Sequence, residues 1–334
     1  MKAKQLIVFD MDGVIIDVSR SYRETVRQTA RLFFKGARAW ENLPDPLFPL
    51  ADLARVKQSG GLNNDWDLTC LILSLLFAVI KKSNRRENEN RQGWTDYENA
   101  IKDLDITGLA EFLHTATRPL TTLLEEKGKQ PDAFVASFYS GDVGSGNIIK
   151  QIFQELYLGK ALFEKTYQMR VKVHPGEGYI NREELLIEKS MLEDLAKNNM
   201  MAIATGRPEV EAYYALNFFD LKKYFPIIYT LDDCIREEQK IYKEERVTLS
   251  LSKPNPFMLD AIAENVKEDC TGFFYVGDMP DDMIAASRSV SGFKGVGLLL
   301  SAPDRDGLKE DLISVGADYV IENFEELRRI IEGR

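Results

Sequence analysis

The sequence is poor in the residues that bind transition metals and form disulfides. Among 334 residues there are two histidines, His114 and His174, and three cysteines, Cys70, Cys234 and Cys270. They lie far apart and form no short-spaced zinc motif, and three scattered cysteines make no disulfide framework. We therefore expect a reducing, cytoplasmic setting and a chemistry that depends on oxygen ligands and carboxylates.

The sequence also lacks a net positive charge and a long apolar run. The 43 lysines and arginines are outnumbered by 53 aspartates and glutamates, which gives a formal net charge of −10. Nucleic-acid-binding proteins usually carry a basic face, so this balance argues against nucleic acid as a partner. The longest apolar stretch, 68–80, is shorter than the roughly 20 residues that span a bilayer. It predicts a buried helix, and we expect no membrane association.

Short apolar runs typical of β-strands occur near the N-terminus and again after residue 200, where they alternate with helical segments. This alternation predicts an α/β fold, a Rossmann-like parallel sheet with helices on both faces. The long, mostly helical stretch between the first two strands indicates an inserted helical domain. We place the sheet domain at 1–17 and 178–334 and the inserted domain at 18–177. The expected strands are 6–9, 201–204, 227–229, 273–276, 296–300 and 319–321.

Polar residues follow the expected strands at the edge of the sheet where parallel α/β proteins bind ligands. Asp10 and Asp12 follow the first strand, and Gly13 comes directly after them. The glycine lets the backbone turn so that both acids reach one site. Strand-end aspartates also cap turns and helices, so this pair alone does not identify a functional site.

The later strand ends carry a hydroxyl, an amine and more carboxylates. Thr205 and Gly206 offer a hydroxyl and a backbone N–H to an anion, although a threonine at this position also serves as a helix cap. Lys253 lies ahead of a helix, between residues that restrict the backbone. Asp278 and Asp282 open another helix, where acids also favour the helix dipole.

Taken together and in this order, the strand-end motifs resemble those of the haloacid dehalogenase superfamily, in its subfamily I phosphatase branch. The intervening helices correspond in position to the type-1 helical cap of that family. The matches are Asp10 and Asp12 to the DxD motif, Thr205 to the Thr/Ser motif, Lys253 to the lysine motif, and Asp278 with Asp282 to the GDxxxD motif.

The resemblance implies a Mg²⁺-dependent phosphatase that hydrolyses a small phosphomonoester. Asp10 would attack phosphorus and form an aspartyl-phosphate. Asp12 would protonate the leaving oxygen and later accept a proton from the attacking water. Lys253, the Thr205 hydroxyl and the Gly206 N–H would hold the transferring phosphoryl oxygens.

Mg²⁺ is the cofactor that the resemblance implies, and it suits a site rich in oxygen ligands. The expected metal ligands are Asp10, the backbone carbonyl of Asp12, and Asp278. Asp282 either binds the metal through water or orients Lys253. An acid at position 12 favours phosphate esters, because family members that cleave carbon–halogen or carbon–phosphorus bonds generally lack it.

The inserted domain is expected to select the substrate. Two glycines and clustered amides at 57–67 predict a substrate-reading loop that contains Asn63 and Asn64. Alternatively, Asn64 or Asp65 caps the apolar helix that follows. Arg55 and Lys57 are candidates for a second contact to an anionic substrate.

Two alternatives to the phosphatase stay open from the sequence. A phosphomutase of a sugar phosphate would use the same aspartyl-phosphate and the same Asp12, and the motifs do not distinguish it. A non-catalytic phosphometabolite-binding or scaffold protein would use the apolar stretch 68–80 as a partner or dimer surface. The filled catalytic positions argue against this second alternative, while a homodimer stays a candidate assembly.

Overall fold

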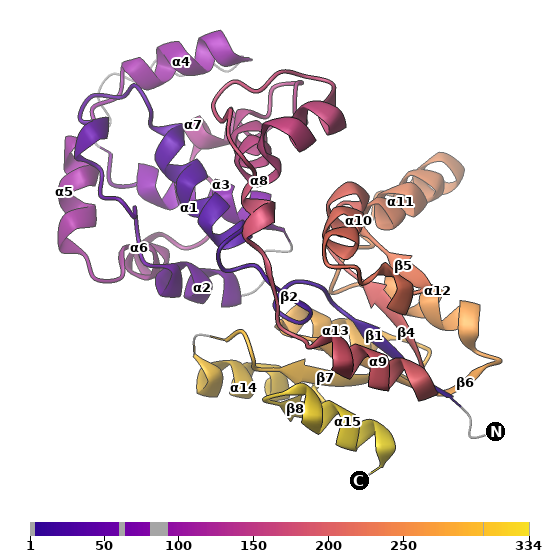
Figure 1. Cartoon of the computed structure of the whole chain (residues 1–334). Coiled ribbons are helices and arrows are strands. Elements are labelled where there is room, and N and C mark those ends of the chain that lie inside the picture. The colour runs from indigo at the N-terminus through magenta and orange to yellow at the C-terminus, as the bar shows by residue number, and fades with distance from the viewer. Residues whose placement is uncertain (1–3, 60–63, 81–92, 303, 334) are drawn as a thin grey trace. The chain divides into compact units, whose positions relative to one another are not determined.

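The computed structural model describes residues 4–59, 64–80, 93–302 and 304–333. The chain divides into two compact units (Figure 1). The first, here called the sheet unit, comprises Met1–Val18 and Glu184–Arg334. The second, the helical unit, comprises Ser19–Glu183.

In the described part of the chain, six parallel strands form the main sheet, in the order β5-β4-β1-β6-β7-β8. This sheet, with helices between successive strands along the chain, confirms the predicted α/β fold. The strands are β1 (Lys4–Phe9), β4 (Asn199–Ala204), β5 (Ile227–Tyr229), β6 (Cys270–Gly277), β7 (Lys294–Leu298) and β8 (Tyr319–Ile321).

β1 is a central strand of the sheet, and its apolar side chains are typical of a strand that has another strand on each side. The last four residues of β1, Leu6 to Phe9, are all 0% exposed, as expected for a strand covered on both faces. β1 pairs with β4 on one side and with β6 on the other. The chain adds β4 and β5 on one side before it crosses to β6, so the strand order reverses at β1. Ligands of open α/β sheets bind at the carboxyl ends of strands at such a reversal.

Helices α12 (Phe257–Val266) and α13 (Pro280–Arg288) pack on one face of the sheet and share its core with Val8 and Ala204. Two short strands, β2 (Ile16–Asp17) and β3 (Glu184–Leu185), pair in antiparallel fashion where the chain leaves and re-enters the sheet unit. The helical elements of the sheet unit are α9 (Lys189–Asn198), α10 (Glu209–Phe218), η3 (Lys222–Tyr224), α11 (Leu231–Glu245), α12 (Phe257–Val266), α13 (Pro280–Arg288), α14 (Arg305–Ser314) and α15 (Phe324–Glu332).

The helical unit is built around α3 (Asp65–Phe77), which confirms the buried helix predicted for the apolar stretch. Every residue from Leu68 to Phe77 is buried, which argues against the alternative in which this stretch is a partner or dimer surface. None of the described helices is long and apolar enough to cross a membrane. The other helical elements are α1 (Tyr22–Phe33), η1 (Trp40–Asn42), α2 (Leu50–Gln58), α4 (Trp94–Lys102), α5 (Thr107–Thr115), α6 (Pro119–Lys127), α7 (Ala133–Ala136), α8 (Ile148–Tyr167) and η2 (Tyr179–Arg182).

The helical unit extends to Glu183, whereas the sequence suggested that the sheet domain resumes at residue 178. Gly178 packs against the backbone at Gly159, where an added Cβ would lie 2.1 Å from the Gly178 nitrogen. The buried Glu183 carboxylate accepts hydrogen bonds from Ser21 Oγ at 3.0 Å and from Tyr157 Oη at 2.9 Å. These contacts tie the segment to the helical unit, and they depend on packing rather than on local sequence.

Candidate active site

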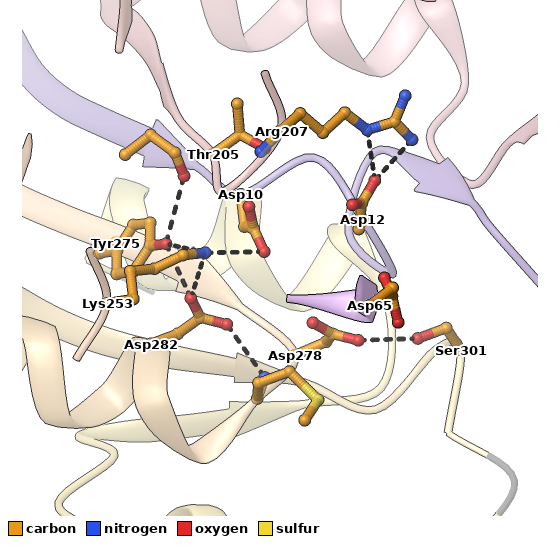
Figure 2. Close-up of polar contacts among 12 residues, drawn as sticks. Asp10, Asp12, Asp65, Thr205, Arg207, Lys253, Tyr275, Asp278, Asp282 and Ser301 are labelled. Atoms are coloured by element: carbon orange, nitrogen blue, oxygen red, sulfur yellow. Dashed lines mark hydrogen bonds and ion pairs between the residues drawn. The ribbon is translucent and has the colours of Figure 1, made fainter. Parts of the chain in front are cut away.

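The predicted polar residues of the sheet unit gather at the carboxyl ends of three adjacent strands (Figure 2). Asp10 directly follows β1, and its backbone N–H donates to the Val276 carbonyl of β6 at 2.9 Å. Thr205 directly follows β4, and Asp278 directly follows β6. Because these three strands are neighbours in the sheet, their ends deliver side chains from distant parts of the chain to one place.

The Lys253 ammonium group contacts three oxygen atoms. Its Nζ lies 3.0 Å from Asp10 Oδ2, 2.7 Å from Asp282 Oδ1 and 3.0 Å from Tyr275 Oη. Burial opposes the positive charge, but the carboxylates of Asp10 and Asp282 hold the pKa of Lys253 well above its ordinary value. The amine therefore stays protonated and presents a fixed positive charge beside Asp10.

Both carboxylate oxygens of Asp282 are used within the protein. Oδ1 accepts hydrogen bonds from Lys253 Nζ and, at 2.8 Å, from Tyr275 Oη. Oδ2 accepts from the Met279 backbone N–H at 3.0 Å, at the start of α13. The residue is 1% exposed. Of the two roles that the sequence left open for Asp282, these contacts favour the orientation of Lys253.

Tyr275 is also part of this network, although no motif in the sequence indicates it. It lies on β6 and is 0% exposed, and a buried tyrosine hydroxyl usually has a hydrogen-bond partner. Its hydroxyl contacts Lys253, Asp282 and, at 3.4 Å, the Ala204 carbonyl. The sequence feature that could have pointed to Tyr275 is its position in a buried strand that leads directly into a predicted catalytic motif.

Three buried carboxylates form a candidate metal site. Asp10, Asp278 and Asp282 each place an oxygen within 4.8 Å of the others. Burial is the largest cause that raises the pKa of Asp10, to about 8; Lys253 opposes the rise, and Asp282, Asp12 and Asp278 add to it. The single positive charge of Lys253 therefore does not balance the negative charges of the neighbouring carboxylates. A divalent cation with a preference for oxygen ligands would relieve it, so this set of donors fits Mg²⁺.

Gly13 allows the turn after β1 to lie against Asp278. It has a φ of +74°, and a Cβ at this position would come within 2.0 Å of Asp278 Oδ2. Ser301 Oγ donates to the same oxygen at 3.4 Å, and no sequence motif predicts this contact. The glycine therefore leaves room for a carboxylate of the candidate metal site.

We expect the substitution Gly13→Ala to displace Asp278 and to weaken Mg²⁺ binding at least ~10-fold, because one carboxylate leaves its place. The backbone strain alone costs about 1–2 kcal/mol. Gly292→Ala is a matched control, since Gly292 has a φ of +75° with no atom within 4 Å of the added Cβ. The Mg²⁺-dependent rise of the melting temperature measures the difference. Equal Mg²⁺ responses of the two variants would contradict this role of Gly13.

Thr205 and Gly206 occupy the turn between β4 and α10. Thr205 is 0% exposed, and its backbone N–H donates to the Tyr229 carbonyl at 3.0 Å. Its Oγ1 accepts a hydrogen bond from the Arg207 N–H at 3.2 Å, and Gly206 is exposed. These bonds hold the backbone of Thr205 in place, while the contact of both residues with a phosphoryl group stays a prediction.

The Asp12 carboxylate contacts Arg207 on the neighbouring turn. Arg207 Nε donates to Asp12 Oδ1 at 2.7 Å, and Nη2 lies 2.5 Å from the same oxygen. The Arg207 side chain is 0% exposed and the Asp12 side chain 26%. No local pattern in the sequence indicates this pair, because 195 positions separate the two residues. The metal contact predicted for Asp12 concerns its backbone carbonyl and stays a prediction.

The remaining predicted substrate contacts belong to the helical unit. Asn64 is the N-cap of α3, and its side chain accepts a backbone hydrogen bond from the first turn at 2.7 Å. Arg55 and Lys57 lie on α2, and Lys57 Nζ is 3.0 Å from Asp65 Oδ1. Asn63 lies outside the described residues. Substrate contacts by these residues stay predictions.

The family model for haloacid dehalogenase-like hydrolases matches residues 4–289. A curated protein, imidazoleglycerol-phosphate dehydratase of Phytophthora nicotianae, is 23% identical over 287 residues. The match covers 85% of this chain and 41% of that protein, so the chain spans about two fifths of the length of this relative.

Solved structures share the fold at low sequence identity. A structural genomics target has a TM-score of 0.64 and is 22% identical, with 99% of this chain and 98% of that chain covered. A phosphatase from Thermococcus thioreducens has a TM-score of 0.50 at 19% identity, covering 92% and 99%. A predicted phosphoglycolate phosphatase from Haemophilus somnus has a TM-score of 0.50 at 13% identity, covering 99% of each chain. At these identities the likeness concerns the fold alone.

Proposed function

Because the chain belongs to the family of haloacid dehalogenase-like hydrolases, we propose that it is a Mg²⁺-dependent phosphatase of a small phosphomonoester. One observation carries this proposal: Asp10, at the reversal of strand order, lies 3.0 Å from the protonated Lys253 within a cluster of buried carboxylates. A nucleophilic carboxylate beside a fixed cation suits attack on a phosphate group.

The reaction proceeds in two half-reactions at Asp10. Its carboxylate bonds to phosphorus as the ester oxygen departs, and this oxygen takes a proton from Asp12. Water then attacks phosphorus, the bond to Asp10 breaks, and Asp12 takes a proton from the water. Inorganic phosphate and the alcohol are the products, and both aspartates return to their starting states.

Cations and hydrogen-bond donors are needed because a phosphate dianion approaches a negatively charged site. Lys253, the Thr205 hydroxyl and the Gly206 N–H hold the phosphoryl oxygens as charge develops on them. Asp10, Asp278 and the Asp12 backbone carbonyl would hold Mg²⁺. When bound, the metal ion supplies further positive charge and helps to orient the phosphate.

The proposal is tested by phosphate release from p-nitrophenyl phosphate in the presence of Mg²⁺ and of EDTA. We expect turnover with Mg²⁺, a fall of at least ~100-fold in EDTA, since a metal ion stabilises the transition state by several kcal/mol, and recovery when excess Mg²⁺ is added. Undiminished turnover in EDTA would contradict the metal dependence.

A metabolite-phosphate screen with phosphate detection then identifies the substrate class. Stoichiometric phosphate release supports the phosphatase, while isomer interconversion without free phosphate would instead indicate the phosphomutase. Absence of turnover with every substrate would favour the non-catalytic alternative.

A further inference from the structure

From the buried contact between Arg207 and Asp12 we infer that Arg207 is a positioning residue, which leaves Asp12 Oδ2 as the oxygen that exchanges the proton. This inference rests on the proposed phosphatase function and adds a residue to it. Arg207 Nε and Nη2 both contact Oδ1 of the carboxylate, at 2.7 and 2.5 Å (Figure 2). Neither contact involves Oδ2.

Asp12 needs such a partner because it lies on a turn. It follows β1 rather than belonging to it, and its side chain is 26% exposed. An unrestrained carboxylate at this position would sample several rotamers. Proton transfer requires the acid to lie within hydrogen-bond reach of the leaving oxygen, and an error of 1 Å can cost about 100-fold in rate.

Arg207 is suited to this task because its side chain is fully buried and its backbone is hydrogen-bonded on both sides. Its side chain is 0% exposed, and a guanidinium group is costly to bury unless charge and hydrogen bonds compensate it. Its backbone N–H donates to Thr205 Oγ1 at 3.2 Å, and its carbonyl accepts from the Leu231 N–H at 3.0 Å. The anchor of Asp12 is thus part of the turn that presents the predicted phosphate-binding hydroxyl.

The contact assigns a separate task to each oxygen of Asp12. Oδ1 stays with Arg207 throughout. In the first half-reaction the proton leaves Oδ2 for the ester oxygen as the bond between that oxygen and phosphorus breaks. In the second, a proton of the attacking water returns to Oδ2 while the water oxygen bonds to phosphorus and the bond from Asp10 to phosphorus breaks.

The test compares two leaving groups, with the enzyme loaded with Mg²⁺. Phenol has a pKa of about 10, like the tyrosine side chain, so phenyl phosphate needs the proton donor. p-Nitrophenol is more acidic, so p-nitrophenyl phosphate needs it less. We expect Arg207→Lys, which keeps the charge but loses the planar fork, to lower kcat/KM by about 100-fold for phenyl phosphate and by about 10-fold or less for p-nitrophenyl phosphate.

Asp12→Asn should show the same selectivity with a larger loss. In the Asp12→Asn background, Arg207→Lys should cost little further activity, because residue 12 no longer transfers the proton whose donor Arg207 positions. Arg236→Lys is the control, since Arg236 makes its ion pairs with Glu209 and Asp233 on an exposed surface. Thermal melting of each variant shows whether it is folded, and Arg207→Gln replaces Arg207→Lys if the lysine variant does not fold.

The outcomes separate the inference from the function on which it rests. The role of Arg207 would be overturned, while the phosphatase stands, by any of three results for Arg207→Lys. These are equal losses of kcat/KM for both leaving groups, an unchanged kcat/KM, or the same loss in the Asp12→Asn background. If Asp12→Asn itself shows no selectivity between leaving groups, Asp12 is not the acid, and both the mechanism and the inference fail.

Discussion

Replacement of Asp10 by Asn is expected to lower kcat/KM for p-nitrophenyl phosphate by at least ~10⁴-fold, the order of loss found when a nucleophile is removed. An amide of nearly the same size cannot form the acyl phosphate. Radiolabel from a phosphate-labelled substrate should be trapped on the wild-type chain after acid quenching but not on Asp10→Asn. Asp278→Asn is the comparison variant, because it should weaken Mg²⁺ binding and yet leave label on Asp10 at high Mg²⁺.

The same substitution should stabilise the metal-free protein, which distinguishes loss of the nucleophile from misfolding. Burial and neighbouring carboxylates raise the pKa of Asp10 from its ordinary value of 3.8 to about 8. Between these values the folded state binds a proton that the unfolded chain has released. The contribution of Asp10 to the free energy of unfolding therefore falls as the pH rises from about 4 to about 8.

Asp10→Asn removes this pH dependence. In EDTA near pH 7.5 we expect the variant to be more stable than wild type by at least ~1 kcal/mol, or about 2–4 °C in melting temperature. Mg²⁺ should raise the melting temperature of the wild type and have little effect on the variant. A variant that melts well below wild type in EDTA would contradict the conclusion that burial and neighbouring carboxylates raise the pKa of Asp10.

Replacement of Lys253 by Met is expected to have the opposite effect on stability and a severe effect on activity. It leaves Asp10 and Asp282 without the cation that lies 3.0 and 2.7 Å away. Removal of one partner of a buried ion pair typically costs 3–5 kcal/mol, so the melting temperature should fall by roughly 10 °C. Because the positive charge that stabilises the phosphoryl oxygens is lost, kcat should fall about 10²–10³-fold.

Lys253→Arg is the matched control for charge. It should recover much of the stability but little of the activity, because a guanidinium group cannot reproduce the ammonium contacts with Asp10, Asp282 and Tyr275. Thermal melting with and without Mg²⁺, together with steady-state kinetics, measures both effects. An unchanged melting temperature in Lys253→Met would mean that the neighbouring carboxylates carry no charge that Lys253 compensates.

The positions of Asp10, Thr205 and Asp278 along the chain could be predicted because each directly follows a strand, whereas Lys253, expected after the third strand, lies between α11 and α12. Apolar runs such as 6–9 and 201–204 indicate buried strands, and the residues that follow them lie at the carboxyl edge of a parallel sheet. The insertion of helices after the first strand was also readable from periodicity. Its far boundary was not, because Glu183 belongs to the helical unit through contacts with Ser21 and Tyr157.

The partners of the catalytic candidates were decided only by the tertiary structure. The sequence names Asp12 but does not show that Arg207, 195 positions away, binds one of its oxygens. It names Lys253 and Asp282 but not the Tyr275 hydroxyl that contacts both of them. The physical reason is that a buried strand can be recognised from the apolar character of consecutive residues. Side-chain contacts between distant residues depend instead on which strands become neighbours in the sheet. By itself the sequence determined the family, the fold and the residues at the strand ends; the order β4-β1-β6 decided which of them touch.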